Sequence, residues 1–161
     1  MAYNPAAAVA YAHQWAFGRN PRYADFSAMG GDCTNFISQC LYAGCGVMNY
    51  TKDVGWYYRS LQDRAAAWTG VVYLYNFLTR NRGRGPYGQA APLSQVRPGD
   101  VIQLRLGEPR FGHSLLVVET GVRPAPGNIL IATHTLDSDR RPLSTYHYQE
   151  ARAIQILGAR G

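Results

Sequence analysis

The chain has 161 residues, of which 47% are hydrophobic and 12% aromatic. This length supports one domain with a buried core and is short for two, so we expect a single domain over residues 1–161. The formal charge of +6, from 16 basic and 10 acidic residues, favours an anionic partner such as nucleic acid or a teichoic-acid-bearing wall. The basic residues are scattered instead of forming runs, so we do not expect nucleic-acid binding.

The first residues, Met1–Pro5, lack the basic and apolar regions of a secretion signal. No apolar run approaches the roughly 20 residues that a membrane span requires. We therefore expect a chain that is made in the cytoplasm and does not cross a membrane. Action at a cell wall would then require release by lysis, or trimming of a longer chain. Three cysteines cannot all pair with one another, so at least one thiol should be free.

Three helices are predicted in the first half of the chain. Apolar residues recur at helical spacing over residues 5–17, which follow an Asn-Pro start signal. A second helix should begin at Cys33 and end near Gly44, because a residue without a side chain suits a left-handed cap. A third helix, capped by Thr69, should run over residues 71–78.

A long aromatic segment, over about residues 46–95, separates the second helix from the strands that follow. Its rings include Trp56, Tyr57 and Tyr58, which we expect to form one wall of a substrate cleft. The alternative is that these rings cover the hydrophobic face of a helix and belong to the core. The Gly- and Arg-rich residues 82–92 are expected to be the most mobile part of the chain.

From residue 98 onward the apolar period changes from the helical value to two, which is typical of strands. Four strands are predicted, near residues 102–106, 115–118, 129–132 and 153–157. Because helices come first and strands follow with short turns between them, we predict an α+β fold with an antiparallel sheet.

Cys33 lies at the start of its helix, directly after Asp32, which is expected to cap the first turn. The positive end of a helix favours an anion, and a thiolate is the nucleophilic form of cysteine. We also assign Asp32 to the substrate cleft. The alternative for Cys33 is a buried structural role, which is common for free cysteines.

Two histidines follow at the ends of predicted strands, His113 at the start of one and His134 at the end of the next. If Thr120 pairs with Gly127, the same register pairs the two histidines on one face of the hairpin. Next to Cys33, His113 would then act as base and acid while His134 orients its ring.

Asp137 is an alternative third residue, in the case that it, and not His134, orients His113. A zinc site from these two histidines, Cys33 and Asp137 is compatible in ligand type, but the paired spacing of common zinc sites is absent. We therefore expect neither a metal nor an organic cofactor.

Four segments together resemble the papain-like NlpC and CHAP cysteine hydrolases of bacterial cell walls. They are Asp32-Cys33-Thr34, Arg97-Pro98-Gly99-Asp100-Val101, Gly112-His113-Ser114 and His134, in that order. The stretch from Gly30 to Leu41 and the later Trp56-Tyr57-Tyr58 and His134-Thr135-Leu136-Asp137 resemble more closely the bacterial "putative amidase domain" group of that clan.

The resemblance implies a papain-like fold in which the helix that carries the nucleophile packs on the antiparallel sheet. It implies that Cys33 is the nucleophile, His113 the base and His134 the third member of the site. The implied activity is cleavage of an amide bond in cell-wall peptidoglycan, by a lytic amidase or endopeptidase, through a thioester. Two alternatives stay open: an amidase or deconjugating peptidase with a non-wall substrate, and an idle module that binds a glycan or nucleic acid.

Overall fold

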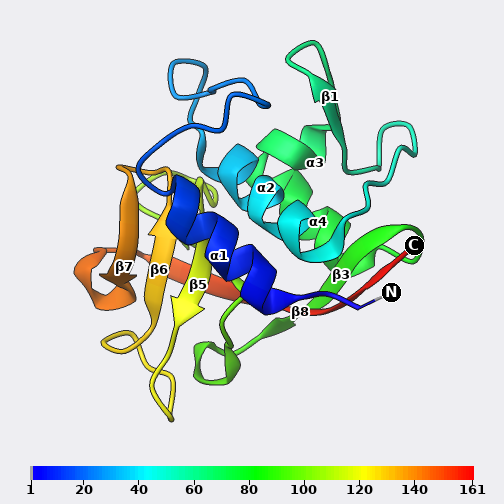
Figure 1. Ribbon diagram of the computed structural model, residues 1–161. Coiled ribbons are helices and arrows are strands. Elements are labelled where there is room, and N and C mark those ends of the chain that lie inside the picture. Colours follow the sequence, from blue (N-terminus) through cyan, green and yellow to red (C-terminus); the bar gives the residue numbers. More distant parts are fainter. Residues whose placement is uncertain (1) are drawn as a thin grey trace.

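The computed structural model describes residues 2–161, and this part of the chain contains four α-helices and eight β-strands (Figure 1). The helices are α1 (Pro5–Trp15), α2 (Cys33–Cys45), α3 (Ala66–Thr69) and α4 (Val71–Arg80). The strands are β1 (Tyr58–Ser60), β2 (Asp63–Arg64), β3 (Gly85–Ala91), β4 (Val101–Arg105), β5 (His113–Glu119), β6 (Leu130–Thr133), β7 (Ser138–Pro142) and β8 (Glu150–Arg160). None of the helices in residues 2–161 is long and apolar enough to cross a membrane.

Six strands form one antiparallel sheet in the order β3-β8-β4-β5-β6-β7, while β1 and β2 form a separate small hairpin. Helix α1 packs on one face of the sheet, against β5 and β6, and α2 lies beside α1 (Figure 1). The predicted α+β class with an antiparallel sheet is therefore confirmed.

The start of α1 follows the prediction, because the Asn4 side chain accepts a hydrogen bond from the Ala7 amide and Pro5 occupies the first turn. The end of α2 differs from it. Gly44 stays inside the helix, and Gly46 adopts the left-handed cap with a φ of 71°. A side chain at Gly44 would collide with Tyr3, so this glycine serves the close approach of the N-terminal segment.

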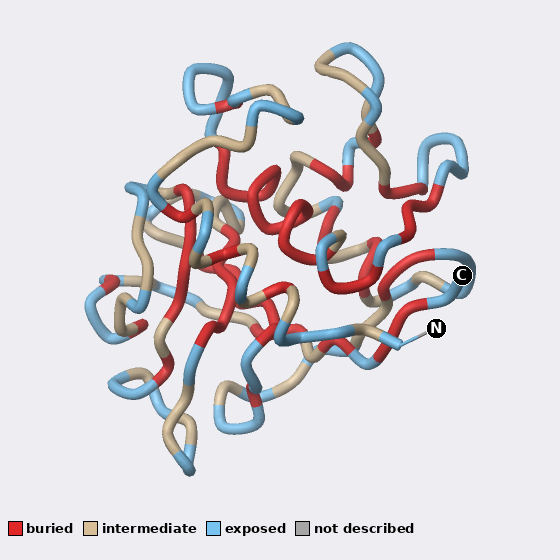
Figure 2. Tube along the Cα trace, viewed as in Figure 1, coloured by how far each residue is buried: buried red, intermediate tan, exposed pale blue. Residues whose placement is uncertain are grey.

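The sheet buries apolar residues on both faces. The larger core lies between the sheet and the helices, and α2 is buried along almost its whole length (Figure 2). The second core lies on the other face, where the segments around Leu93 and Tyr146 pack over the middle strands. Because α2 is enclosed on most sides, its first residue is held in a fixed place relative to the sheet.

The aromatic segment contains the predicted third helix as α4, and also β1, β2 and α3, which the sequence did not predict. Residues 85–91, expected to be mobile, form β3 and pair with β8. Trp56 is fully buried and its indole nitrogen donates to the Ser38 hydroxyl at 3.0 Å. Trp56 packs on Trp68, which is also fully buried, so these rings belong to the core.

Candidate active site

Cys33 is the first residue of α2 and is 7% exposed. Its thiol lies 3.8 Å from the Thr34 hydroxyl and donates toward the carbonyl oxygen of Gly112 at 3.9 Å. Since Gly112 directly precedes His113, the fold brings the cysteine to the start of the strand that begins with this histidine. All three cysteines are free.

The other two thiols differ from Cys33 in their surroundings. Cys40 is fully buried on the inner side of α2, and burial raises its pKa well above the ordinary value. Burial also raises the pKa of Cys45, although a hydrogen bond with the Val47 backbone opposes this shift. Both thiols therefore stay protonated at neutral pH and are poor nucleophiles.

A second contact joins the first turn of α2 to β5. The hydroxyls of Thr34 and Ser114 lie 2.9 Å apart, and both side chains are fully buried. Ser114 also accepts a hydrogen bond from Gln103 on the neighbouring strand β4 at 3.3 Å. These buried polar contacts fix the position of Cys33 relative to β5, because a shift of α2 along the strand would leave the hydroxyls without partners.

His113 has partners at both ring nitrogens. Nε2 lies 2.8 Å from Oε1 of Glu108, and Nδ1 lies 3.2 Å from the hydroxyl of Thr135. The imidazole is 23% exposed, so one side of the ring is open to solvent. Within residues 2–161, the Cys33 thiol makes two polar contacts, and neither is with His113.

The predicted pairing of His113 with His134 is wrong. Strands β5 and β6 pair Leu116 with Ala132, and a bulge shifts the register near Glu119. Continued toward the hairpin mouth, this register places Thr135 opposite His113, in agreement with their side-chain contact. A shift of one residue moves a side chain to the other face of a sheet, so the two imidazoles are separated.

His134 is instead part of a buried contact on the helix side of the sheet. Its Nδ1 lies 2.5 Å from Oδ2 of Asp32, and its Nε2 lies 2.8 Å from the carbonyl oxygen of Trp15. The ring stacks on Phe36 with centroids 3.9 Å apart. Both nitrogens are thus occupied, and His134 joins α1, α2 and the end of β6 without orienting His113.

Asp32 likewise has a different role from the one predicted. Its side chain makes no capping bond to the first turn of α2, and it is only 1% exposed. The second carboxylate oxygen accepts from the Phe26 amide at 2.8 Å and from the Asn35 side chain at 3.0 Å. Asp32 therefore connects the preceding loop with the first turn of α2, and because it is buried it does not line an open cleft.

Asp137 does not contact His113 either. Its two carboxylate oxygens accept from Nη1 and Nη2 of Arg19, each at 3.0 Å. Cys33, His113, His134 and Asp137 do not gather into a possible set of metal ligands, since no group of three or more such side chains does so in residues 2–161.

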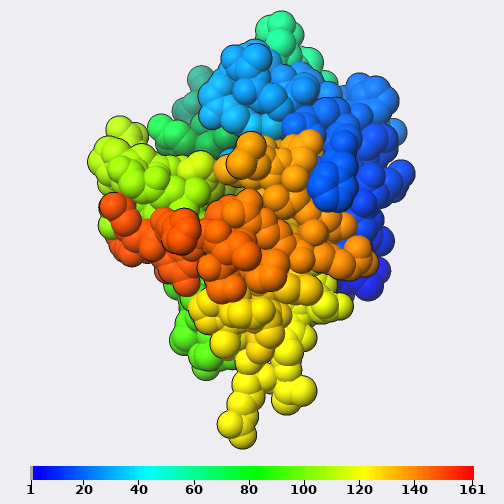
Figure 3. Space-filling model, turned by 90° about the vertical axis from the view of Figure 1, so that its left-hand side faces the viewer, coloured from blue at the N-terminus to red at the C-terminus, as the bar shows by residue number. Residues whose placement is uncertain are grey.

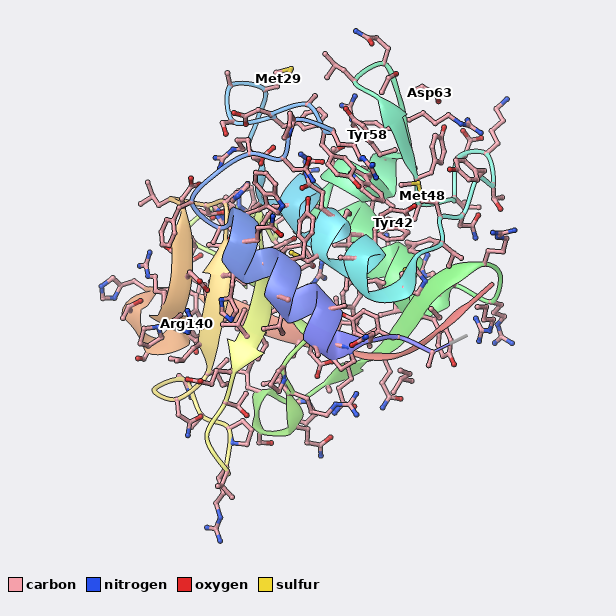
Figure 4. The ribbon with its side chains drawn as sticks, in the orientation of Figure 1. Met29, Tyr42, Met48, Tyr58, Asp63 and Arg140 are labelled. Atoms are coloured by element: carbon pink, nitrogen blue, oxygen red, sulfur yellow. The ribbon has the colours of Figure 1, made fainter. Side chains whose placement is uncertain are left out.

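The prediction that Trp56 forms part of a cleft wall is wrong, because its ring is fully buried. Trp56 is buried in the core, and the Tyr58 hydroxyl accepts a hydrogen bond from the Ala24 amide at 2.8 Å. Tyr57 donates to Asp63 on the β1–β2 hairpin at 3.3 Å. Figure 4 shows Tyr58 and Asp63 in the region of this hairpin, at the upper right of the view. A pocket of about 500 Å³ lies between the 49–55 loop and α4, and its lining residues do not include Cys33.

Sequence reasoning missed Glu108 and Thr135, the two residues that contact His113. Three chain segments around this site meet on one face of the molecule in Figure 3: the loop before Cys33, the 107–112 turn and the segment after His134. An acidic residue in a Gly-Pro turn five positions before a candidate histidine was a usable signal for Glu108. Thr135 required the strand register, which the bulge alters.

The family described as "Putative amidase domain" matches residues 2–157. The chain is also similar to the uncharacterized protein YhbB of Bacillus subtilis (strain 168), with 32% identity over 142 residues. That match covers 86% of this chain and 43% of the relative, so the chain spans less than half of the relative's length. No solved structure matches the chain. The family match covers nearly the whole sequence, and the protein therefore belongs to the putative amidase domain family.

Proposed function

We propose that the protein is a cysteine hydrolase that cleaves an amide bond, with Cys33 as the nucleophile and His113 as the general base and acid. The observation that carries this proposal is the placement of the Cys33 thiol at the start of a buried helix, 3.9 Å from the carbonyl oxygen of the residue before His113. The family description supports amide hydrolysis, and the free thiol supplies a nucleophile for it.

In the proposed reaction, His113 takes the thiol proton and the Cys33 sulfur attacks the carbonyl carbon of the amide. The oxyanion that forms is stabilised by the positive end of α2, where the first backbone N–H groups have no acceptor within the helix. The intermediate collapses to a thioester as the amine leaves with the proton from His113. Water then attacks the thioester while His113 accepts its proton, and the acid product and the thiol are released.

The proposed substrate is the peptide part of bacterial peptidoglycan, which would make the protein a lytic amidase or endopeptidase. The net charge of +6 supports this proposal, because a basic protein is held near an anionic wall. A bacterial relative is consistent with it. We also propose that the protein is related to the papain-like NlpC and CHAP enzymes. This proposal is supported by the position of Cys33 at the start of a helix and of His113 at the start of a strand in an antiparallel sheet.

Digestion of purified peptidoglycan, followed by mass spectrometry of the soluble fragments, tests this function. The native protein should release whole stem peptides if it is an amidase, or fragments with cut stem peptides if it is an endopeptidase. Cys33→Ala should release neither. Cys40→Ala is the matched control, since it removes a thiol from the same helix and should keep the activity. Cleavage by Cys33→Ala would overturn the cysteine mechanism. Cleavage of a simple aminoacyl anilide by the native protein, but not of peptidoglycan, would overturn the wall substrate only.

A further inference from the structure

The contact between His113 and Glu108 lies outside every role that the sequence assigned. Oε1 of Glu108 is 2.8 Å from Nε2 of His113, and the two side chains are 33% and 23% exposed. We propose that Glu108 is the positioning residue of the site, which orients His113 and stabilises its protonated form. This inference rests on the proposed function, in which His113 exchanges a proton with Cys33.

The turn that carries Glu108 is built to hold this carboxylate next to the imidazole. The other carboxylate oxygen accepts a hydrogen bond from the Leu106 amide at 2.7 Å. Arg105 donates to the Glu108 carbonyl oxygen at 3.5 Å, and the Gly112 amide donates to Leu104 across the base of the turn at 3.1 Å. Glu108 is therefore anchored through its backbone and through one oxygen, and its second oxygen is left for His113.

Gly112 leaves the space that this arrangement requires. A Cβ atom at position 112 would collide with Oε1 of Glu108, the atom that contacts His113. The same residue supplies the carbonyl oxygen toward which the Cys33 thiol points. A glycine at position 112 thus leaves room for the Glu108 carboxylate beside His113, while its carbonyl oxygen faces the Cys33 thiol.

A carboxylate at Nε2 determines the state of the ring. Because an ionised carboxylate only accepts hydrogen bonds, Nε2 must carry a proton, and Nδ1 is then the acceptor in the neutral ring. The Thr135 hydroxyl at 3.2 Å can donate to Nδ1 in the resting state. Proton transfer from Cys33 requires Nδ1 to exchange this hydroxyl for the sulfur, and the Glu108 bond acts as the pivot for that movement.

The charge of Glu108 is secured by its own surroundings. The backbone amide of Glu108 itself lowers the pKa of this carboxyl, and the Leu106 amide and His113 lower it further. The carboxylate is therefore ionised at neutral pH and can accept a hydrogen bond from His113. Asp32 and Asp137, the two acidic residues that the sequence assigned to the site, contact His134 and Arg19 instead.

The test measures the rate at which iodoacetamide alkylates Cys33 at several pH values between 5 and 9. Peptide mapping follows the alkylation of Cys33 at each pH. In Glu108→Gln the shape is kept but the charge is lost, so the thiolate–imidazolium pair should be less stable. We expect alkylation about 10-fold slower at pH 6, equivalent to one pKa unit of lost charge stabilisation. Near pH 9, above the ordinary pKa of a cysteine thiol, the rate should equal the native rate.

Glu119→Gln is the matched control, because Glu119 lies at the opposite end of β5 and is exposed. It should keep the native pH profile. Gly112→Ala is a second test variant, which displaces the carboxylate without removing its charge, and it should give the same pH-dependent loss as Glu108→Gln. If Glu108→Gln melts at a lower temperature than the native protein, the pH profile of Gly112→Ala tests the positioning role in its place.

The outcomes separate this inference from the proposed function. A native pH profile in both Glu108→Gln and Gly112→Ala, with Cys33 still reactive at pH 6, would overturn the role of Glu108 alone. A native Cys33 that is inert at pH 6, together with amide cleavage by Cys33→Ala, would overturn the cysteine mechanism itself. An equal loss of rate at pH 6 and pH 9 would indicate a distorted site and would also contradict the positioning role.

Discussion

The buried pair of Asp32 and His134 leads to a prediction about stability, and His134→Ala is the variant that tests it. The two side chains are 1% and 2% exposed and lie 2.5 Å apart, so the variant leaves a carboxylate in the core without one of its partners. Removing one member of a buried pair costs about 3–5 kcal/mol. Arg19 remains 3.5 Å from Asp32 and offsets part of this cost, so we expect a value near the lower end.

Loss of the stack on Phe36 adds to this cost, since a paired ring is worth about 0.5–1.5 kcal/mol beyond its buried area. At about 2–4 °C per kcal/mol for a protein of this size, a combined loss of about 4 kcal/mol lowers the melting temperature by roughly 8–16 °C. Thermal unfolding measures the shift, with exposed His147→Ala as the control that should not move. A His134→Ala protein that melts within 2 °C or so of the native one but has lost turnover would refute the reasoning, because it would make His134 catalytic.

Three further outcomes are expected. Trp56→Ala should cost about 3–5 kcal/mol in urea unfolding, because the ring is fully buried, while the folded fraction keeps its kcat/KM; normal stability with weakened substrate binding would contradict this. Because burial raises the pKa of Cys40 and Cys45, iodoacetamide at pH 6 should label Cys33 first in peptide maps, and faster labelling of Cys45 would argue against it. Gly46→Ala should cost about 1–2 kcal/mol, measured by the same urea unfolding, since φ is 71° and no neighbouring atom obstructs a side chain; an unchanged midpoint would show that the cap can relax.

Much of the fold is encoded in local patterns. Helical spacing predicted α1, α2 and α4, alternation predicted β4, and apolar runs predicted β5, β6 and β8. Strand β3 was missed because its glycines and proline read as a loop, and its order comes from pairing with β8. Strand β7 was missed because Ser138–Pro142 is a polar edge strand without apolar alternation.

The candidate site divides in the same way. The placement of Cys33 at the start of α2 and of His113 at the start of β5 was predictable, since each depends on neighbouring residues in the chain. The partners of His113 depend on a bulge in the β5–β6 pairing and on the path of a turn, which no spacing rule contains. His134 shows the consequence, because one residue of register decides whether it meets His113 or Asp32.

The central claim is that Cys33 forms a covalent thioester with the acyl part of the substrate. It is tested most directly by quenching the protein with acid during turnover of an amide substrate and measuring the intact mass. The claim predicts a species heavier by the mass of the acyl group, located on the peptide that contains Cys33, removed by hydroxylamine and absent in Cys33→Ala. Turnover by Cys33→Ala, or an acyl group on any other residue, would contradict it.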